Sequence, residues 1–239
     1  MNRAVLSLVV IVLSSLCSQA GKLEQALADL DILLVNRMDF INAKHASIDS
    51  LKEIYAQAGD GDGLLKIAEA YTGLSADSAI VYADRAQILA AQAGDSVKAR
   101  RAAILLAANL GKAALFDEAY RAIGKGYSPE ASRGEKLAYY GTLGRINIDE
   151  MNYHSLQRPR QAALDKAIAA LDSSAVLLPE KNLARRMINA QRQFLKGDTA
   201  IALGEMYEVL AKLDTADPSY AVATGLMAGF YQGQEDKRV

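Results

Sequence analysis

The fold class is decided by residues 194–202, which read Phe-Leu-Lys-Gly-Asp-Thr-Ala-Ile-Ala. An apolar helix end runs into a Gly-Asp turn, and a second helix follows at once with small residues. Small side chains at such a crossing let two helix backbones approach closely, while the glycine relaxes the turn. A similar arrangement occurs where an apolar helix over 106–110 is followed by the Phe-Asp-Glu-Ala sequence of 116–119. The sequence therefore predicts helical hairpins as the unit of the fold.

Helical periodicity continues through most of the chain. Apolar residues and one histidine recur at steps of three, four or seven in the clearest stretch, at Leu30, Leu34, Ile41, His45, Ile48, Leu51 and Tyr55. They predict a long first helix over about 27–58. Further helices are expected at about 64–72, 77–93, 96–112, 116–124, 132–152, 160–175, 181–196, 199–213 and 218–232, where glycines and prolines mark the ends. No stretch alternates with a period of two, so the class is all-α.

The composition excludes several classes of function. The chain has 239 residues, 27 Lys+Arg against 28 Asp+Glu, and a formal charge of -1. Nucleic-acid binding needs a concentrated basic face, and no basic run is present, so we expect no nucleic-acid partner for this segment. One Cys allows no intrachain disulfide and no Cys-rich zinc site, and two His leave little for a His-based metal centre.

The N-terminus has the pattern of a signal peptide. Arg3 precedes an apolar run from Ala4 to Leu13, and small residues follow. Ser18-Gln19-Ala20 fits the small-x-small rule, so cleavage is expected between Ala20 and Gly21. The domains predicted are a signal peptide over 1–20 and a helical repeat domain over 21–239. We expect an exported, periplasmic protein that meets the membrane only through this peptide or through a C-terminal helix missing from the chain.

No catalytic, cofactor-binding or metal-binding residue is predicted, and no cofactor is expected. His45 lies on the apolar stripe, where a partly buried position explains it. Glu150 and His154 are four residues apart at a helix end, where a surface contact explains them. The Asp60-Gly61-Asp62-Gly63 segment fails the calcium-loop pattern because its sixth and twelfth positions are Leu65 and Tyr71, so we interpret it as a flexible turn. We expect a non-enzymatic protein whose ligand groove the sequence does not locate.

The hairpins resemble the tetratricopeptide repeat, and several segments are similar to one family in particular. These segments are Leu30-Asp31, Asn36-Arg37, Asp39, Lys44, residues 48–52, 77–79, 82–83 and 116–119, Tyr139-Tyr140 and residues 170–174. They resemble a family of exported Bacteroidota proteins, a domain of unknown function. The resemblance implies a right-handed superhelix of helix hairpins in the periplasm, typically followed by a transmembrane helix and a helix-turn-helix of the LuxR kind. This chain would be its N-terminal part.

The end of the chain raises a further expectation. Pro218 opens a helix to Tyr231, and the sequence stops at Val239 without a partner helix. We expect a solenoid truncated at a half-repeat, in which Leu226, Met227 and Phe230 lie on an uncovered face available for self-association.

Two functions remain open from the sequence. The leading one is a sensing or docking domain that binds a peptide or protein partner in its concave groove, as the input part of a membrane-anchored transcriptional regulator. The alternative is a self-standing periplasmic scaffold or adaptor. Glycan binding is disfavoured because carbohydrate sites use Trp and this chain has none.

Overall fold

The computed structural model describes residues 28, 31–32, 34–58 and 61–235. These residues contain helices and no strand, so the all-α prediction is confirmed. The chain divides into two compact units, residues 1–53 and 54–239, and each is described by itself. The first unit holds most of helix α2 (Arg37–Ala58).

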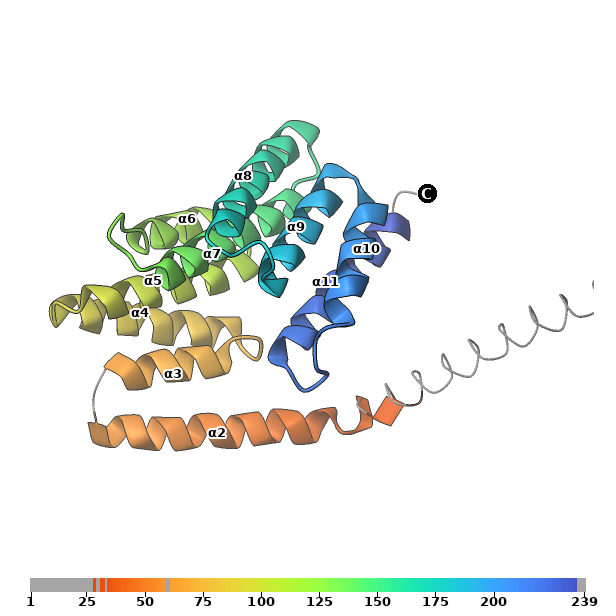
Figure 1. Cartoon of the computed structure of the whole chain (residues 1–239). Helices are drawn as coiled ribbons and strands as arrows, with labels where there is room; N and C mark the ends of the chain where they lie inside the picture. The colour runs from red at the N-terminus through yellow and green to blue at the C-terminus, as the bar shows by residue number, and fades with distance from the viewer. Residues whose placement is uncertain (1–27, 29–30, 33, 59–60, 236–239) are drawn as a thin grey trace, which may run out of the picture. The chain divides into compact units, whose positions relative to one another are not determined.

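The second unit is built of consecutive helices joined by short loops (Figure 1). Their bounds are α3 (Gly61–Tyr71), α4 (Ala76–Gln92), α5 (Ser96–Lys112), α6 (Phe116–Lys125), α7 (Arg133–Tyr153), α8 (Gln157–Val176), α9 (Leu183–Lys196), α10 (Thr199–Leu210) and α11 (Pro218–Glu235). Helices α3 and α4, α5 and α6, α7 and α8, and α9 and α10 pack as hairpins, and α11 packs on α10 and α9. The predicted hairpin architecture is therefore present.

Local sequence signals fix where these helices begin and end. Asp95 caps α5 by accepting a hydrogen bond from the backbone N–H of Lys98 at 3.0 Å. Ser132 and Glu135 form a capping box at the start of α7. Gly94 and Gly197 have φ values of +72° and +96°, a region that glycine enters without steric penalty. Gly94 follows the C-cap Ala93 of α4, and Gly197 is itself the C-cap of α9.

Alanine and branched aliphatic side chains form the core of the hairpins. Ala103, Ala107 and Ala119 are completely buried where α5 meets α6. At the α5–α7 contact, a Cβ added to Gly111 would lie 2.9 Å from Cγ1 of the buried Ile146. The α5 and α7 backbones therefore approach closely at this point, as expected for small residues at helix crossings.

Several sequence-based boundaries differ from the structure. The glycine-rich segment predicted to be a flexible turn is largely helical, because α3 begins at Gly61 and includes Asp62 and Gly63. An acidic residue in the first turn favours helix through the helix dipole, and Asp62 also pairs with Lys98 Nζ at 3.3 Å. Helix α8 begins at Gln157 and contains Pro159, which the first turn tolerates because its N–H would lack a helical partner. Helix α10 ends at Leu210 rather than near 213.

The helical residues of the first unit are less buried than the predicted apolar stripe requires. Helix α2 begins at Arg37, and the described residues before it, 28, 31–32 and 34–35, are also helical, so the predicted long helix is interrupted by a turn at Asn36. His45 is exposed, so its expected partly buried position is wrong, whereas Ile48 one turn later is 1% exposed. Leu34, Val35 and neighbouring apolar residues are more than half exposed.

Candidate functional site

A groove of about 410 Å³ lies in the second unit, and it is the candidate binding site. One wall is formed by Leu137, Gly141, Arg145 and Ile148 on a single face of α7. The opposite wall is formed by Ala184, Met187, Ile188 and Gln191 of α9.

The floor and open edge come from three other segments. Leu171 and Ser174 of α8, with Leu178 of the following loop, form the floor. Val222 and Leu226 of α11 complete the lining. The surface is mostly aliphatic, with one arginine, one glutamine and one serine, which is the usual composition of a ligand pocket.

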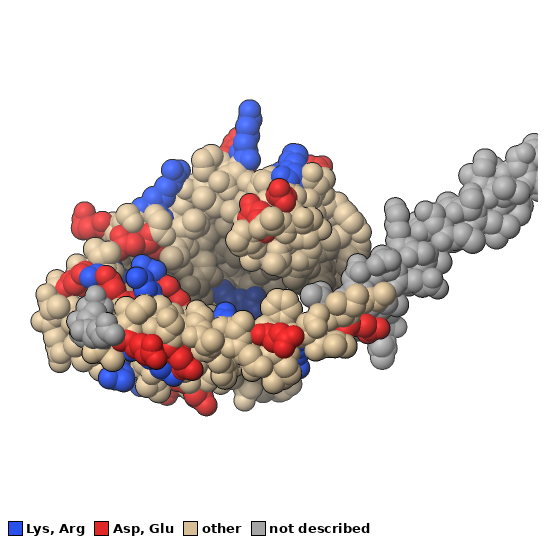
Figure 2. Space-filling view, turned by 90° about the horizontal axis from the view of Figure 1, so that it is seen from below, with Lys and Arg blue, Asp and Glu red and all other residues tan. Residues whose placement is uncertain are grey.

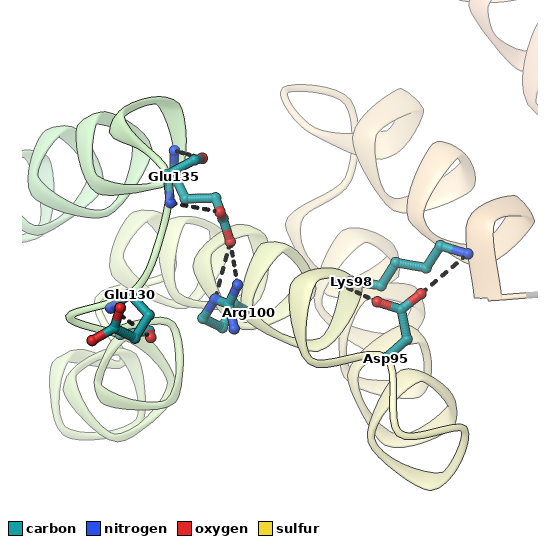
Figure 3. A network of polar contacts seen from close by, with 7 residues as sticks. Asp95, Lys98, Arg100, Glu130 and Glu135 are labelled. Carbon is teal, nitrogen blue, oxygen red and sulfur yellow. Dashed lines mark hydrogen bonds and ion pairs between the residues drawn. The ribbon is translucent and has the colours of Figure 1, made fainter.

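The groove exists because α7 and α9 stand apart. Helices α5 and α7 pack directly, whereas no Cα of α7 lies within 8 Å of a Cα of α9. Arg100 of α5 also bonds Glu135 of α7, a link that Figure 3 shows between the two helices. No comparable link joins α7 to α9 in the described chain, so α8 is left as the floor between them.

Two arginines fix the loop at one end of the groove. Arg133 of α7 donates a hydrogen bond to the carbonyl of Leu177, and Arg185 of α9 donates one at 2.9 Å to the carbonyl of Leu178. These carbonyls follow the last turn of α8, where helical partners are missing. The spacing of α7, α8 and α9 is therefore set by polar contacts from both walls to the same loop.

Gly141 leaves the α7 wall open. A Cβ placed on it would meet no atom within 4 Å. A glycine inside a helix costs about 1 kcal/mol relative to alanine, and neither a close neighbour nor a positive φ requires one here. The glycine keeps the α7 backbone accessible from the groove.

Ser174 places an unpaired polar atom beneath the groove. Its side chain is completely buried, and Oγ has no hydrogen-bond partner. A buried polar atom without a partner costs about 1–3 kcal/mol, so proteins rarely keep one. The Ser174 hydroxyl is therefore a buried, unpaired polar group beneath the floor, and it is not accessible from the groove.

Arg145 supplies the positive charge at the groove. Its Nε donates to the Asp149 carboxylate, at 3.0 Å from Oδ1 and 3.3 Å from Oδ2. Burial raises the pKa of Asp149, while Arg145 and Lys112 act in the opposite direction. The Arg145 side chain is 61% exposed, so its guanidinium reaches solvent at the rim.

The sequence-predicted contact between Glu150 and His154 is present, with 3.5 Å between Oε1 and Nε2. The single hydroxyl proton of Tyr120 is shared between two acceptors, the Glu150 carboxylate and, at 2.8 Å, Oδ1 of the buried Asn147. Burial, followed by the Glu150 contact, raises the pKa of Tyr120. This cluster ties α6 to α7 and does not line the groove.

The other candidate residues lie apart from the groove. Tyr139 packs against Tyr127 and Tyr140 with ring centroids 5.2 and 5.1 Å away. Ala20 and Gly21, the predicted cleavage site, are outside the described residues. Within the described residues no group of three His, Cys, Asp or Glu side chains could hold a metal ion, and no helix is both long and apolar enough to cross a membrane.

Leu226, Met227 and Phe230 of α11 were expected to lie on an uncovered face. This expectation is wrong for two of the three residues. Met227 and Phe230 are 9% and 3% exposed, and Phe230 stacks on Phe194 of α9 with a centroid distance of 4.5 Å. Both belong to a core formed with α9 and α10, because the face of α11 folds back onto that hairpin. Leu226 remains partly exposed and lines the groove, together with Val222.

The sequence alone did not predict that this groove is a binding site. It named Ser174 only within a segment of family resemblance, and it did not single out Gly141 or Arg145. A glycine at the centre of α7 without a packing role was the available signal, but the packing around it becomes known only from the fold.

Comparison with known proteins identifies the family. The family model described as SusR N-terminal TPR domain matches residues 34–239. No curated protein is similar enough to the chain to count as a match. The chain belongs to the SusR N-terminal TPR domain family, which confirms the predicted tetratricopeptide architecture and the assignment to an N-terminal part.

Proposed function

We propose that this TPR domain is a non-enzymatic sensing domain that binds a peptide segment in the groove between α7 and α9. A TPR domain indicates a protein-interaction role, and the groove gives that role a location. The observation that carries the proposal is the open, mostly aliphatic groove itself, in which Gly141 leaves the α7 backbone accessible.

The electrostatics of the surface support a protein partner over a nucleic acid. The formal charge is -1, and acidic and basic side chains are interspersed on the face that Figure 2 shows. Phosphate-backbone binding requires a cluster of Lys and Arg on one face. The groove itself contributes one arginine, already in contact with Asp149.

The cellular context is also part of the proposal. The N-terminal pattern supports export to the periplasm, with cleavage before Gly21. The family resemblance supports a role as the input part of a membrane-anchored transcriptional regulator. N-terminal sequencing of the protein from a periplasmic extract tests export, and an N-terminus at Met1 in the cytoplasm would refute it.

A self-standing scaffold is the second candidate function, and one observation favours it. Met227 and Phe230 are buried against α9 and α10, so they are not available for docking onto a further repeat. The two candidates differ in the consequence of binding. A scaffold needs only the groove, whereas a sensor also needs a conformational change that reaches an output module.

Selection from a peptide library tests the binding function. Gly141→Leu should fill the groove without disturbing the core, because a Cβ there has no neighbour within 4 Å. Gly134→Leu is the matched control, since Gly134 is also on α7, also has no neighbour within 4 Å, and does not line the groove. The wild type and the control should enrich the same short peptides from a library with free C-termini, and Gly141→Leu should not. Equal enrichment by all three proteins, or by none, would refute the function.

A further inference from the structure

The helices of the second unit form two groups, and each group has its own hydrophobic core. The core of α9, α10 and α11 consists of buried residues of these three helices alone, among them Met187, Met206 and Phe230. In the described part of the chain, the cores of α3 to α8 contain no buried residue of α9, α10 or α11. Because a close-packed core resists deformation, each group moves as one body.

The contact between the two groups is made by α8 and α9. Among the described helices, this is the one pair across the boundary whose Cα atoms come within 8 Å of each other. Ile188 and Leu195 of α9 pack, partly buried, on the aliphatic core of α7 and α8. Arg192 of α9 pairs with Asp172 of α8, with 3.0 Å from Nη1 to Oδ1, and these side chains are 27% and 51% exposed. Aliphatic contacts and a partly exposed ion pair allow two helices to rotate on each other.

The segment that connects α8 to α9, residues 177–182, has the features of a pivot. Arg133 and Arg185 donate hydrogen bonds to two consecutive carbonyls at its start. Both bonds end on the connecting segment, so they hold it in place without joining the α7 wall to the α9 wall. The far end of the groove, at Arg145 and Gln191, has no hydrogen bond or ion pair between α7 and α9 in the described chain. The groove is therefore fixed at one end and free to change its width at the other.

We propose that α9, α10 and α11 pivot together on α8 and close the groove when it is empty, and that a bound peptide holds the walls apart. The driving force is the aliphatic lining, which both groups supply. Leu137 of α7 faces Ile188, Val222 and Leu226 of α9 and α11 across the groove, and all four are at least partly exposed. Closure removes this apolar surface from water, and a peptide that fills the groove replaces the same contacts.

Closure supplies the conformational change that a sensor needs and a scaffold does not. The coupling to a ligand rests on the proposed peptide-binding function, whereas closure of the empty groove does not. A peptide that binds only the open arrangement shifts the population toward it. Since α11 belongs to the moving group, occupancy of the groove becomes a displacement of α11 relative to α3–α8.

Disulfide trapping on the full chain tests closure without any ligand. Gly141→Cys on α7 and Gln191→Cys on α9 are introduced together with Cys17→Ser, so that they are the only cysteines. A disulfide needs its two Cα atoms within about 7 Å. No Cα of α7 lies within 8 Å of a Cα of α9, so the open arrangement cannot form the bond. With oxidised glutathione as the oxidant, the pair should nevertheless become crosslinked, because the walls close.

A second pair of cysteines is the matched control. Gly124→Cys on α6 and Ala169→Cys on α8 lie on exposed positions of two helices that belong to the same group. These helices are neighbours, since Lys166 Nζ of α8 lies 5.5 Å from the centre of the Tyr120 ring of α6, but none of their Cα atoms come within 8 Å. This pair should stay reduced under the same conditions.

An enriched peptide tests the coupling. At a peptide concentration about ten times its Kd, crosslinking of the groove pair should slow about tenfold, because the peptide stabilises the open form by a factor of about 1 + [L]/Kd. The crosslinked protein should lose affinity for the peptide and regain it when dithiothreitol reduces the disulfide.

The outcomes separate closure from the binding function. A groove pair that stays reduced, or that crosslinks no faster than the control pair, overturns closure and leaves peptide binding intact. Crosslinking at the same rate with and without the peptide overturns the coupling. Crosslinking of the groove pair in a protein that enriches no peptide supports closure and refutes the proposed function.

Discussion

Arg100 and Glu135 join α5 to α7 through a single oxygen atom, Glu135 Oε1, which accepts from Arg100 Nε at 3.0 Å and from Nη2 at 2.6 Å (Figure 3). The other oxygen, Oε2, accepts from the backbone N–H of Ser132 at 2.9 Å and closes the capping box. One carboxylate therefore stabilises the start of α7 and its attachment to α5. This attachment keeps one side of α7 packed, while its other side faces the groove.

The Glu135 carboxylate makes stability depend on pH. Hydrogen bonds from Ser132, and then the Arg100 contact, lower the pKa of Glu135 from 4.5 to about 2. Because the folded-state pKa is depressed, the stabilisation is complete above about pH 4.5 and declines as the pH falls through about 2. Glu135→Gln keeps an acceptor for the cap but does not titrate. The stability advantage of the wild type over this variant, from urea denaturation, should shrink between pH 4.5 and 2. A stability difference between the wild type and Glu135→Gln that does not change with pH would contradict the lowered pKa of Glu135.

Gly126 should not tolerate alanine. Its added Cβ would lie 2.6 Å from Cγ1 of the buried Ile104 and 3.1 Å from the carbonyl oxygen of Ile123. Overpacking of this kind costs about 1–3 kcal/mol, so Gly126→Ala should lower the free energy of unfolding by that amount. Gly124→Ala is the control two residues earlier, in the last turn of α6, where a Cβ meets nothing within 4 Å, and it should raise stability by up to about 1 kcal/mol. Equal changes in the free energy of unfolding for the two variants would contradict the close packing of Gly126 against Ile104.

Ser174→Ala should stabilise the protein. The variant removes a buried hydroxyl that has no partner, with an expected gain of about 1 kcal/mol and a rise in melting temperature of about 2–4 °C. Ser173→Ala is the neighbouring control, because its hydroxyl already donates to the Ala169 carbonyl at 2.9 Å. The control should change the melting temperature little. Destabilisation by Ser174→Ala would show that the hydroxyl is paired in solution and would contradict this prediction.

The buried face of α11 can be tested in the same way. Phe230 is 3% exposed and stacks on Phe194, so Phe230→Ala should cost about 3–5 kcal/mol in urea denaturation. Tyr231→Ala changes the next residue, which is 43% exposed, and should cost much less. Similar losses for both variants would indicate that α11 does not pack on α9 as described.

The sequence predicted most of the helices because their ends carry local signals. Asp95, Ser132 and Gly197 act within one turn of their own helix, so a pattern along the chain is enough to find them. The predicted helix boundaries were wrong where the position of a residue within the helix mattered more than its intrinsic helix propensity. Gly61 begins a helix despite its low propensity, and Pro159 lies in a first turn where its missing N–H has no consequence.

The groove could not be predicted because it arises between helices whose backbones lie apart. It depends on α7 and α9 standing apart, and on Arg133 and Arg185 reaching carbonyls of a loop distant in sequence from Arg133. Ser173 and Ser174 look equivalent in the sequence. The structure pairs one hydroxyl and buries the other unpaired, a difference that the sequence does not show.

Methyl NMR tests the location of the binding site most directly. On addition of an enriched peptide to methyl-labelled protein, the resonances of Ile148, Met187 and Ile188, which line the groove, should shift or broaden. Those of Ile104 and Ile123, which lie in a core that contains no residue of the groove lining, should remain in place. Shifts confined to the α3–α6 region, with Met187 and Ile188 unchanged, would contradict the central claim that the space between α7 and α9 is where this domain binds.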